Sequence, residues 1–254
     1  SVYAWSVLTR PIMADMGFTL SQTTWTFSLA ILMLGLSAGF LGSFAEKIGP
    51  KKSGLLAMLF WVTGLLGTAY ALSIHNLTLL YLFYGIIGGI GLGIGYITPV
   101  STLVKYFPNH PGFATGLAIM GFGFASLIAG PLMQYLVAQV GLVDTFIILG
   151  VIYLVIMGAS SLYLKAPQPK HSTRTSKDRS TMYVHTHGML ANDAMKTWQF
   201  GALWWVFFIN ITCGIGLLSL ASPMAQEAIG MTPTAAASLV GIIGIFNGGG
   251  RIAW

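Results

Sequence analysis

An arginine lies in the last apolar stretch of the chain, and its side chain is the first candidate for chemistry. Arg251 follows three glycines in residues 241–254, which carry no other charge. An arginine inside a membrane helix costs about 2.5–3.5 kcal/mol on insertion scales, so it needs a partner, an aqueous cavity or a function. Its planar guanidinium suits carboxylates because it donates two parallel hydrogen bonds. Asn247 lies one helical turn earlier on the same face, and together the two side chains indicate a cavity wall.

The depth of Arg251 has two readings. Counted from Thr232, it lies about 28 Å along a helix, which favours a side chain that reaches the lipid headgroups. If this helix instead repeats the helix before Glu46, Arg251 matches Ala38 and lies about 12 Å inside that acid, within the membrane core. The second reading favours a binding role.

Residues 42–52, Gly-Ser-Phe-Ala-Glu-Lys-Ile-Gly-Pro-Lys-Lys, form a second candidate, a gating loop. Gly42 permits close helix approach, and Gly49-Pro50 favours a tight turn. Glu46 can pair with a basic group or with a helix N-terminus, in a clasp that can break and reform. The gating residues that we predict are Gly42, Glu46, Lys47, Gly49, Lys51 and Lys52.

Residues 85–99 contain a glycine-rich run, Gly-Ile-Ile-Gly-Gly-Ile-Gly-Leu-Gly-Ile-Gly, followed by Tyr96 and Pro99. A nucleotide-binding loop would need a strand before it and a helix after it, whereas this run lies inside an apolar stretch. The glycines therefore indicate close helix packing. Pro99 permits a kink, and Tyr96 is placed to border a cavity.

Composition predicts an all-α membrane protein. The chain is 55% hydrophobic and 7% charged, with a mean hydropathy of +0.78. Soluble domains carry about 25% charged residues, so a soluble fold would lack polar surface. Cys213 is the single cysteine, so no disulfide framework is expected.

Apolar stretches long enough to cross the hydrocarbon, about 20 residues each, predict seven spans. They are residues 22–45, 53–73, 78–107, 112–139, 143–165, 197–222 and 233–254. Residues 1–10 are apolar but too short to cross. We expect an internal segment of a longer protein, with half of a first helix followed by seven more.

The basic residues favour one orientation. Ten of the twelve lie in alternate loops, which the positive-inside rule places in the cytoplasm: Lys47, Lys51, Lys52, Lys105, Lys165, Lys170, Arg174, Lys177, Arg179 and Lys196. The opposite side holds Arg10 with Asp15, Asp144 and Glu227.

We expect three parts: 1–165 as a six-helix half, 166–196 as a cytoplasmic loop, and 197–254 as the start of a second half. His171, His185 and His187 in the loop are read as solvated side chains rather than metal ligands.

Several segments together resemble the oxalate/formate antiporter family within the major facilitator superfamily. They are Phe-Asn-Gly-Gly-Gly-Arg-Ile-Ala-Trp at 246–254, Tyr-Ala-Trp-Ser at 3–6, and Gly-Ile-Gly-Tyr at 93–96. Lys-Tyr-Phe-Pro at 105–108, the glycines at 112 and 116, and Ala-Ser-Pro-Met at 221–224 also fit, and residues 42–52 resemble the superfamily's loop between helices 2 and 3.

This resemblance implies a bundle of twelve helices in two halves that works by alternating access, truncated here after helix 8. It implies small organic anions such as formate, oxalate or pyruvate as substrates. Arg251 would bind the carboxylate with Asn247, while Tyr3, Trp5 and Tyr96 would line the cavity. Val2 and Phe122 replace polar residues of the oxalate type, which favours a monocarboxylate. A lysine expected in helix 11 would lie beyond residue 254.

We therefore expect a monomeric, multi-pass carrier in the cytoplasmic membrane that exchanges anions or couples to H⁺. We expect no cofactor, no metal and no nucleic-acid partner. A carrier of a drug or sugar is one alternative, and a non-transporting sensor that signals through residues 166–197 is another. An enzyme is disfavoured because the predicted spans hold no paired carboxylates or metal-ligand clusters.

Overall fold

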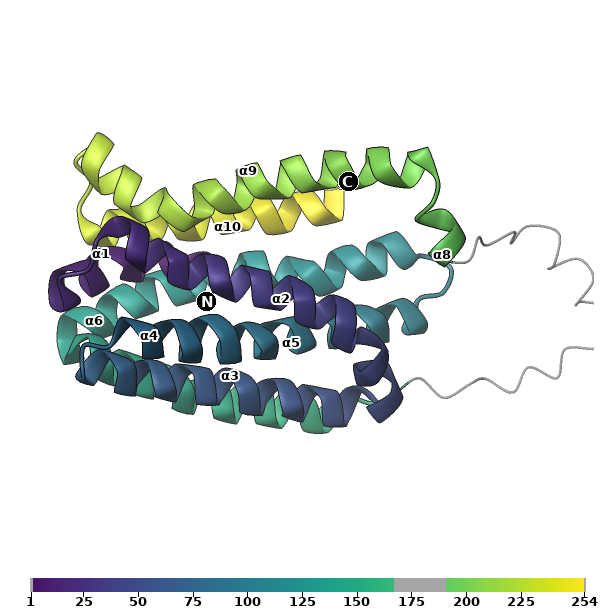
Figure 1. Ribbon diagram of the computed structural model, residues 1–254, viewed down its shortest axis with the longest axis horizontal. Helices are drawn as coiled ribbons and strands as arrows, with labels where there is room; N and C mark the ends of the chain where they lie inside the picture. The colour runs from purple at the N-terminus through teal and green to yellow at the C-terminus, as the bar shows by residue number, and fades with distance from the viewer. Residues whose placement is uncertain (1, 167–190, 254) are drawn as a thin grey trace, which may run out of the picture. The chain divides into compact units, whose positions relative to one another are not determined.

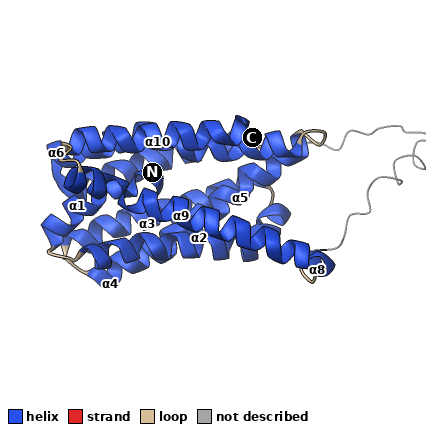
Figure 2. Cartoon of the chain, turned by 90° about the horizontal axis from the view of Figure 1, so that it is seen from above, coloured by secondary structure: helices blue, strands red, loops and turns tan. Residues whose placement is uncertain are grey.

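The computed structural model describes residues 2–166 and 191–253, which form helices joined by short connections, with no strand among them (Figure 2). The helices are η1 (Val2–Ala4), α1 (Trp5–Met16), α2 (Leu20–Ile48), α3 (Pro50–Ser73), α4 (Leu77–Leu80), the π-helical segment η2 (Tyr81–Gly88), α5 (Gly89–Tyr106), α6 (Pro111–Tyr163), α8 (Ala191–Ala194), α9 (Trp198–Ala228) and α10 (Pro233–Ala253). The all-α fold class predicted from composition is confirmed.

Five stretches of the described residues are long and apolar enough to cross a membrane: Leu20–Ile48, Pro50–Ser73, Leu77–Tyr106, Pro111–Tyr163 and Trp198–Ala228. They correspond to six of the seven predicted spans to within two residues at their overhanging ends, because Pro111–Tyr163 covers 112–139 and most of 143–165. The seventh, α10, is not among these stretches.

The chain changes direction within α6. The two spans predicted there meet at Gly141, whose φ of 81° and ψ of 178° interrupt the helical path. A side chain with a Cβ is strained at such a φ, so glycine suits this break. The boundary predicted at 140–142 therefore lies where the helix breaks.

The first helix is longer than the sequence indicated. It was expected to end near Arg10, but α1 continues through Pro11 to Met16 and ends at Gly17, whose φ is 69°. A left-handed glycine closes a helix well, and the N–H of Gly17 donates to the carbonyl of Met13 at 3.0 Å. Pro11 lies in the interior of α1 and removes one backbone hydrogen bond there, yet the helix continues on both sides of it.

The connections between α1, α2 and α3 follow local sequence signals. Thr19 and Gln22 form a capping box at the start of α2. Gly49, with a φ of 83°, turns the chain between α2 and α3, and Pro50 occupies the first turn of α3. The tight turn predicted at Gly49-Pro50 is therefore present.

Contacts divide the chain into two compact units, residues 1–167 with 218–254 and residues 168–217. In the first unit, α2, α3, α5 and α6 lie side by side, and α10 packs along α6 (Figure 1). The second unit contains α8 and the first part of α9, whose large apolar side chains are exposed, including Leu203, Val206 and Phe207. Such a surface suits lipid. Of the predicted central loop, residues 167–190, with the three histidines, lie outside the described residues.

Small residues bring α6 and α10 into close contact. A Cβ added at Gly123 would lie 2.6 Å from the carbonyl oxygen of Gly244 and 2.7 Å from the nitrogen of Gly248. Real Cβ atoms do not approach backbone atoms so closely, so only glycine fits there. Gly244 and Gly248 of α10 thus lie directly against Gly123 of α6.

Candidate functional site

The Arg251 side chain is fixed by two polar neighbours. Its Nε donates to Oδ1 of Asn247 at 3.2 Å, one turn earlier in α10. Its Nη2 donates to the hydroxyl of Tyr3, at the other end of the chain, at 3.3 Å. All three side chains are half-buried. The structure therefore brings together three of the predicted site residues and orients the guanidinium.

An aromatic ring joins a fourth predicted residue to this group. Phe122 of α6 packs edge-to-face on Tyr3, with ring centroids 6.3 Å apart, and on Tyr96 of α5, at 5.6 Å. Tyr3, Phe122 and Tyr96 thus form a continuous row beside Arg251. We call Arg251, Asn247, Tyr3, Phe122 and Tyr96 the Arg251 cluster.

Arg251 has unused donor capacity. No ion pair joins it to a carboxylate within residues 2–166 and 191–253. Two of the five N–H groups of its guanidinium donate to protein acceptors. The remaining donors include the pair on Nη1, and an oxyanion with two oxygens matches that geometry. A half-buried cation without a protein counter-charge favours an anionic ligand.

Trp5 lies apart from this group. Its side chain is 1% exposed and packs on Tyr84 of η2, with ring centroids 4.3 Å apart. Its indole N–H has no hydrogen-bond acceptor among the described residues. The structure therefore places Trp5 in the core, against Tyr84.

The predicted gating residues lie where α2 meets α3. Nζ of Lys105 in α5 lies 3.4 Å from Oε1 of Glu46, which gives the predicted acid a basic partner. Lys47, Lys51 and Lys52 are exposed. A Cβ at Gly42 would lie at an ordinary 3.7 Å from Cγ1 of Ile97, so the contact there does not demand glycine.

The helix around Pro99 carries polar contacts that sequence reasoning missed. The hydroxyls of Ser53 in α3 and Thr98 in α5 lie 2.6 Å apart and are buried. Thr98 also borders a small pocket of about 70 Å³ that contacts Glu46 and Lys105. Pro99 itself lies inside α5, which continues on both sides of it. The π-helical segment η2 was also missed, because its composition resembles that of any apolar helix.

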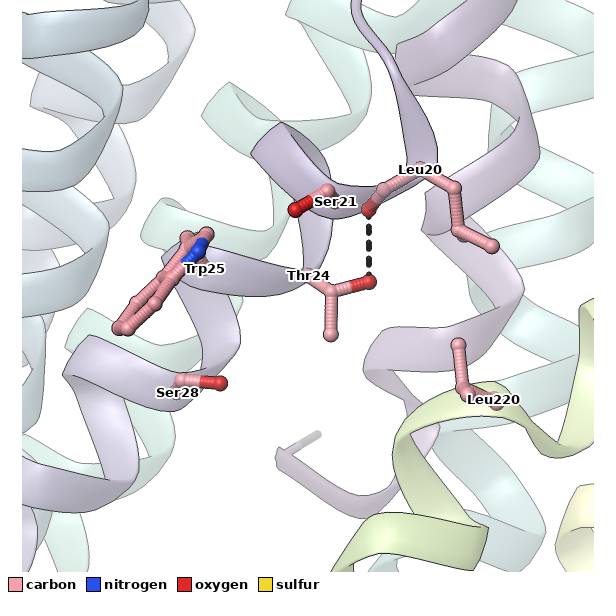
Figure 3. A pocket seen from close by; sticks show the side chains of 6 residues that line it. All are labelled: Leu20, Ser21, Thr24, Trp25, Ser28 and Leu220. Atoms are coloured by element: carbon pink, nitrogen blue, oxygen red, sulfur yellow. Dashed lines mark hydrogen bonds between the residues drawn. The ribbon is translucent and has the colours of Figure 1, made fainter.

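Two larger hollows lie in the first unit. One of about 240 Å³ is lined by Val2, Trp61, Gly91, Leu92, Gly95, Ala118, Gly121, Phe122, Ala125, Tyr153 and Met157, and we call it the apolar cavity. The other, of about 300 Å³, is lined by Leu20, Ser21, Thr24, Trp25, Ser28 and Leu220 (Figure 3). In it the Thr24 hydroxyl donates to the carbonyl of Leu20 at 2.7 Å, and none of its lining residues was predicted as a site.

Residues 2–166 and 191–253 contain no group of three or more His, Cys, Asp or Glu side chains that could hold a metal ion.

Comparisons with known proteins match almost the entire chain. The family model described as Major Facilitator Superfamily matches residues 2–254. The uncharacterized MFS-type transporter YhjX of Escherichia coli is 30% identical over 254 residues, which are 99% of this chain and 60% of that protein. The oxalate:formate antiporter of Oxalobacter formigenes is 24% identical over 253 residues, 99% of this chain and 58% of that protein.

Monocarboxylate transporter 12 of Homo sapiens is 31% identical over 171 residues, covering 62% of this chain and 32% of that protein. The chain spans 60% and 58% of the lengths of the bacterial relatives.

Proposed function

The chain belongs to the Major Facilitator Superfamily, and from this premise we propose that it is part of a secondary carrier of small organic anions. The proposed cargo is a monocarboxylate or small dicarboxylate, of the kind that formate, pyruvate and oxalate represent. Alternating access would move it across the cytoplasmic membrane, by anion exchange or H⁺ coupling. In this proposal the protein is not an enzyme, and residues 166–196 are cytoplasmic.

The observation that carries the proposal is that the Arg251 side chain is half-buried and oriented, yet has no carboxylate partner among the described residues. Asn247 and Tyr3 hold the guanidinium. A desolvated cation gains most from an anion that accepts two hydrogen bonds at once. The names of two relatives, an oxalate:formate antiporter and a monocarboxylate transporter, agree with this cargo.

The proposed roles are divided within the cluster. Arg251 binds the carboxylate, Asn247 and Tyr3 fix its orientation, and Tyr96 lines the cavity beside Phe122. Phe122 carries no hydroxyl, so the wall of the site is less polar than one made only of tyrosines. This favours an anion with one carboxylate over oxalate. Trp5 packs on Tyr84, which in turn packs on Trp61 of the apolar cavity, so its proposed role is to support that wall.

Uptake of labelled pyruvate into liposomes that contain the intact protein tests the proposal. Arg251→Ala is expected to abolish uptake, since the charge and the hydrogen-bond fork are both lost. Arg251→Lys keeps the charge without the fork and is expected to weaken the apparent affinity on the order of 10-fold. Lys196→Ala, which removes an exposed charge at an ion pair with Asp193, is the matched control. Unchanged uptake by Arg251→Ala would refute the role of this arginine.

A thermal-shift screen separates this cargo from a drug or a sugar. Only a ligand that binds the folded state raises the melting temperature, by mass action. We expect organic acids to stabilise the intact protein and neutral sugars to leave it unchanged. Binding of organic acids without any flux would instead favour a sensor.

A further inference from the structure

The apolar cavity touches the Arg251 cluster along one side. Val2 lines the cavity and precedes Tyr3, and Gly95 lines it and precedes Tyr96. Phe122 belongs to both, because it lines the cavity and its ring contacts both tyrosines. A ligand held at Arg251 would therefore have an apolar hollow next to its polar end.

The walls of the cavity are apolar and built to leave space. Trp61 and Tyr153 meet edge-to-face with ring centroids 5.9 Å apart, and Leu92 and Met157 complete the bulky side. Apart from Phe122, the wall formed by the first part of α6 is small in contrast, with Ala118, Gly121 and Ala125. A Cβ added at Gly121 would meet no atom within 4 Å. Larger side chains at these positions would fill the hollow, so the glycine and alanine residues maintain it.

The volume sets the size of the group that fits. A dry cavity of about 150 Å³ lined by apolar side chains holds benzene. The cavity here is about 240 Å³, enough for a phenyl ring or a branched alkyl group. Formate and oxalate have no apolar group and would leave it empty.

We infer that the apolar cavity binds the tail of the carboxylate whose head is held by Arg251. The ligand class is then a monocarboxylate with a phenyl or branched alkyl substituent. This inference rests on the proposed function, because it assumes a carboxylate at Arg251. An amphipathic anion matches the observed order of a polar cluster followed by an apolar hollow, whereas a lipid acyl chain would make no use of the guanidinium.

Calorimetric titration of the intact protein in nanodiscs tests the inference, with acetate and phenylacetate as a matched pair and empty nanodiscs as a blank. These anions share a carboxylate and differ by one phenyl ring. We expect phenylacetate to bind about 10- to 100-fold more tightly, the range for burying one such group. Equal affinities for the two anions would overturn the inference.

A variant that fills the apolar cavity tests whether the phenyl ring of phenylacetate binds there. Gly121→Leu places an isobutyl group in the cavity and is expected to remove the advantage of phenylacetate while acetate binding stays unchanged. Gly112→Leu is the control, because Gly112 lies in α6 outside the cavity and a Cβ there also meets no atom within 4 Å. Ala125→Leu fills the same cavity and replaces Gly121→Leu if that variant does not fold. A phenylacetate advantage that survives filling would place the ring elsewhere.

The same titration separates this inference from the proposed function. If neither anion binds, or if Arg251→Ala binds both as wild type does, the carboxylate site itself is wrong. If both bind through Arg251 with equal affinity, the carboxylate site stands and the tail pocket is wrong. Phenylacetate binding that Gly121→Leu abolishes but Arg251→Ala leaves unchanged would show a hydrophobic pocket independent of the anion, and would also overturn the inference.

Discussion

At the residue scale, the central arrangement is an arginine whose orientation depends on two weak polar contacts. Oδ1 of Asn247 and the hydroxyl of Tyr3 lie 3.2 and 3.3 Å from nitrogens of Arg251. Both acceptors are uncharged, so they orient the guanidinium without neutralising it. An anion that enters the site can therefore still gain the full attraction of the cation.

Removing the Tyr3 hydroxyl tests whether this acceptor orients Arg251 for the anion. Tyr3→Phe deletes the hydroxyl but keeps the ring that packs on Phe122. A hydrogen bond of this kind contributes about 0.5–1.5 kcal/mol, so we expect a 2- to 10-fold loss of carboxylate affinity. Titration with pyruvate measures it. Tyr70→Phe, an exposed tyrosine of α3, is the control. If Tyr3→Phe binds as wild type does, Tyr3 does not orient Arg251.

Sequence reasoning reached part of this cluster. Arg251 is conspicuous as a charge in an apolar stretch, and the four-residue spacing puts Asn247 on its face. The contact between Arg251 and Tyr3 spans 248 positions and has no local signal. Tyr96 was placed at a cavity by its position after the glycine run, whereas Tyr3 and Trp5 came from family resemblance, which does not say which aromatic side chain faces the arginine. Only packing places Trp5 against Tyr84.

At the element scale, α6 and α10 meet through glycines, and this contact positions Arg251. Gly123→Ala is expected to be destabilising, because its Cβ would lie 2.6 Å from a backbone oxygen of Gly244. Overpacking of this type costs about 1–3 kcal/mol. The melting temperature of the purified protein in detergent measures the loss.

A matched control lies two residues earlier on the same helix. A Cβ at Gly121 meets no atom within 4 Å, and alanine favours helix over glycine by about 1 kcal/mol. We expect Gly121→Ala to leave the melting temperature unchanged or to raise it. An equal drop for both variants would contradict the packing argument.

Element boundaries illustrate what local sequence can predict. The break at Gly141 was anticipated by two hydrophobic spans with a short gap, and the turn at Gly49-Pro50 by its residue types. The extension of α1 to Met16 was not anticipated, because residues 1–10 were expected to hold the end of this helix and a helix that continues through an internal proline has no local signal. The close approach of α10 to α6 depends on which glycines face each other, and no single helix carries that information.

At the scale of the whole molecule, the two described ion pairs between distant helices agree with the predicted sides. Arg10 pairs with Glu227 at 3.2 Å, and both were assigned to the side opposite the cytoplasm. Glu46 pairs with Lys105, and both were assigned to the cytoplasmic side. Orientation in the membrane is nevertheless a prediction from loop charge alone.

Cysteine labelling tests the orientation. Cys213, the single cysteine of this chain and an exposed one, is first replaced by alanine together with any cysteine elsewhere in the intact protein. In this background, Asp15→Cys is expected to react with a membrane-impermeant maleimide in intact cells. Lys52→Cys is expected to react only after permeabilisation. The reverse pattern would invert the proposed topology, and the thiol-free background is the control.

The central claim, that Arg251 recognises the charge of a carboxylate, is tested most directly by pairing a substrate anion with its neutral amide. Binding of pyruvate and of pyruvamide to the intact protein is measured by calorimetric titration, for wild type and for Arg251→Gln. Thermal unfolding confirms that the variant is folded. Hydrogen bonds to charged groups contribute about 1.5–3 kcal/mol each, so wild type should prefer pyruvate over pyruvamide on the order of 100-fold. Arg251→Gln should lose most of that preference. A preference that is equal in wild type and variant would contradict the account.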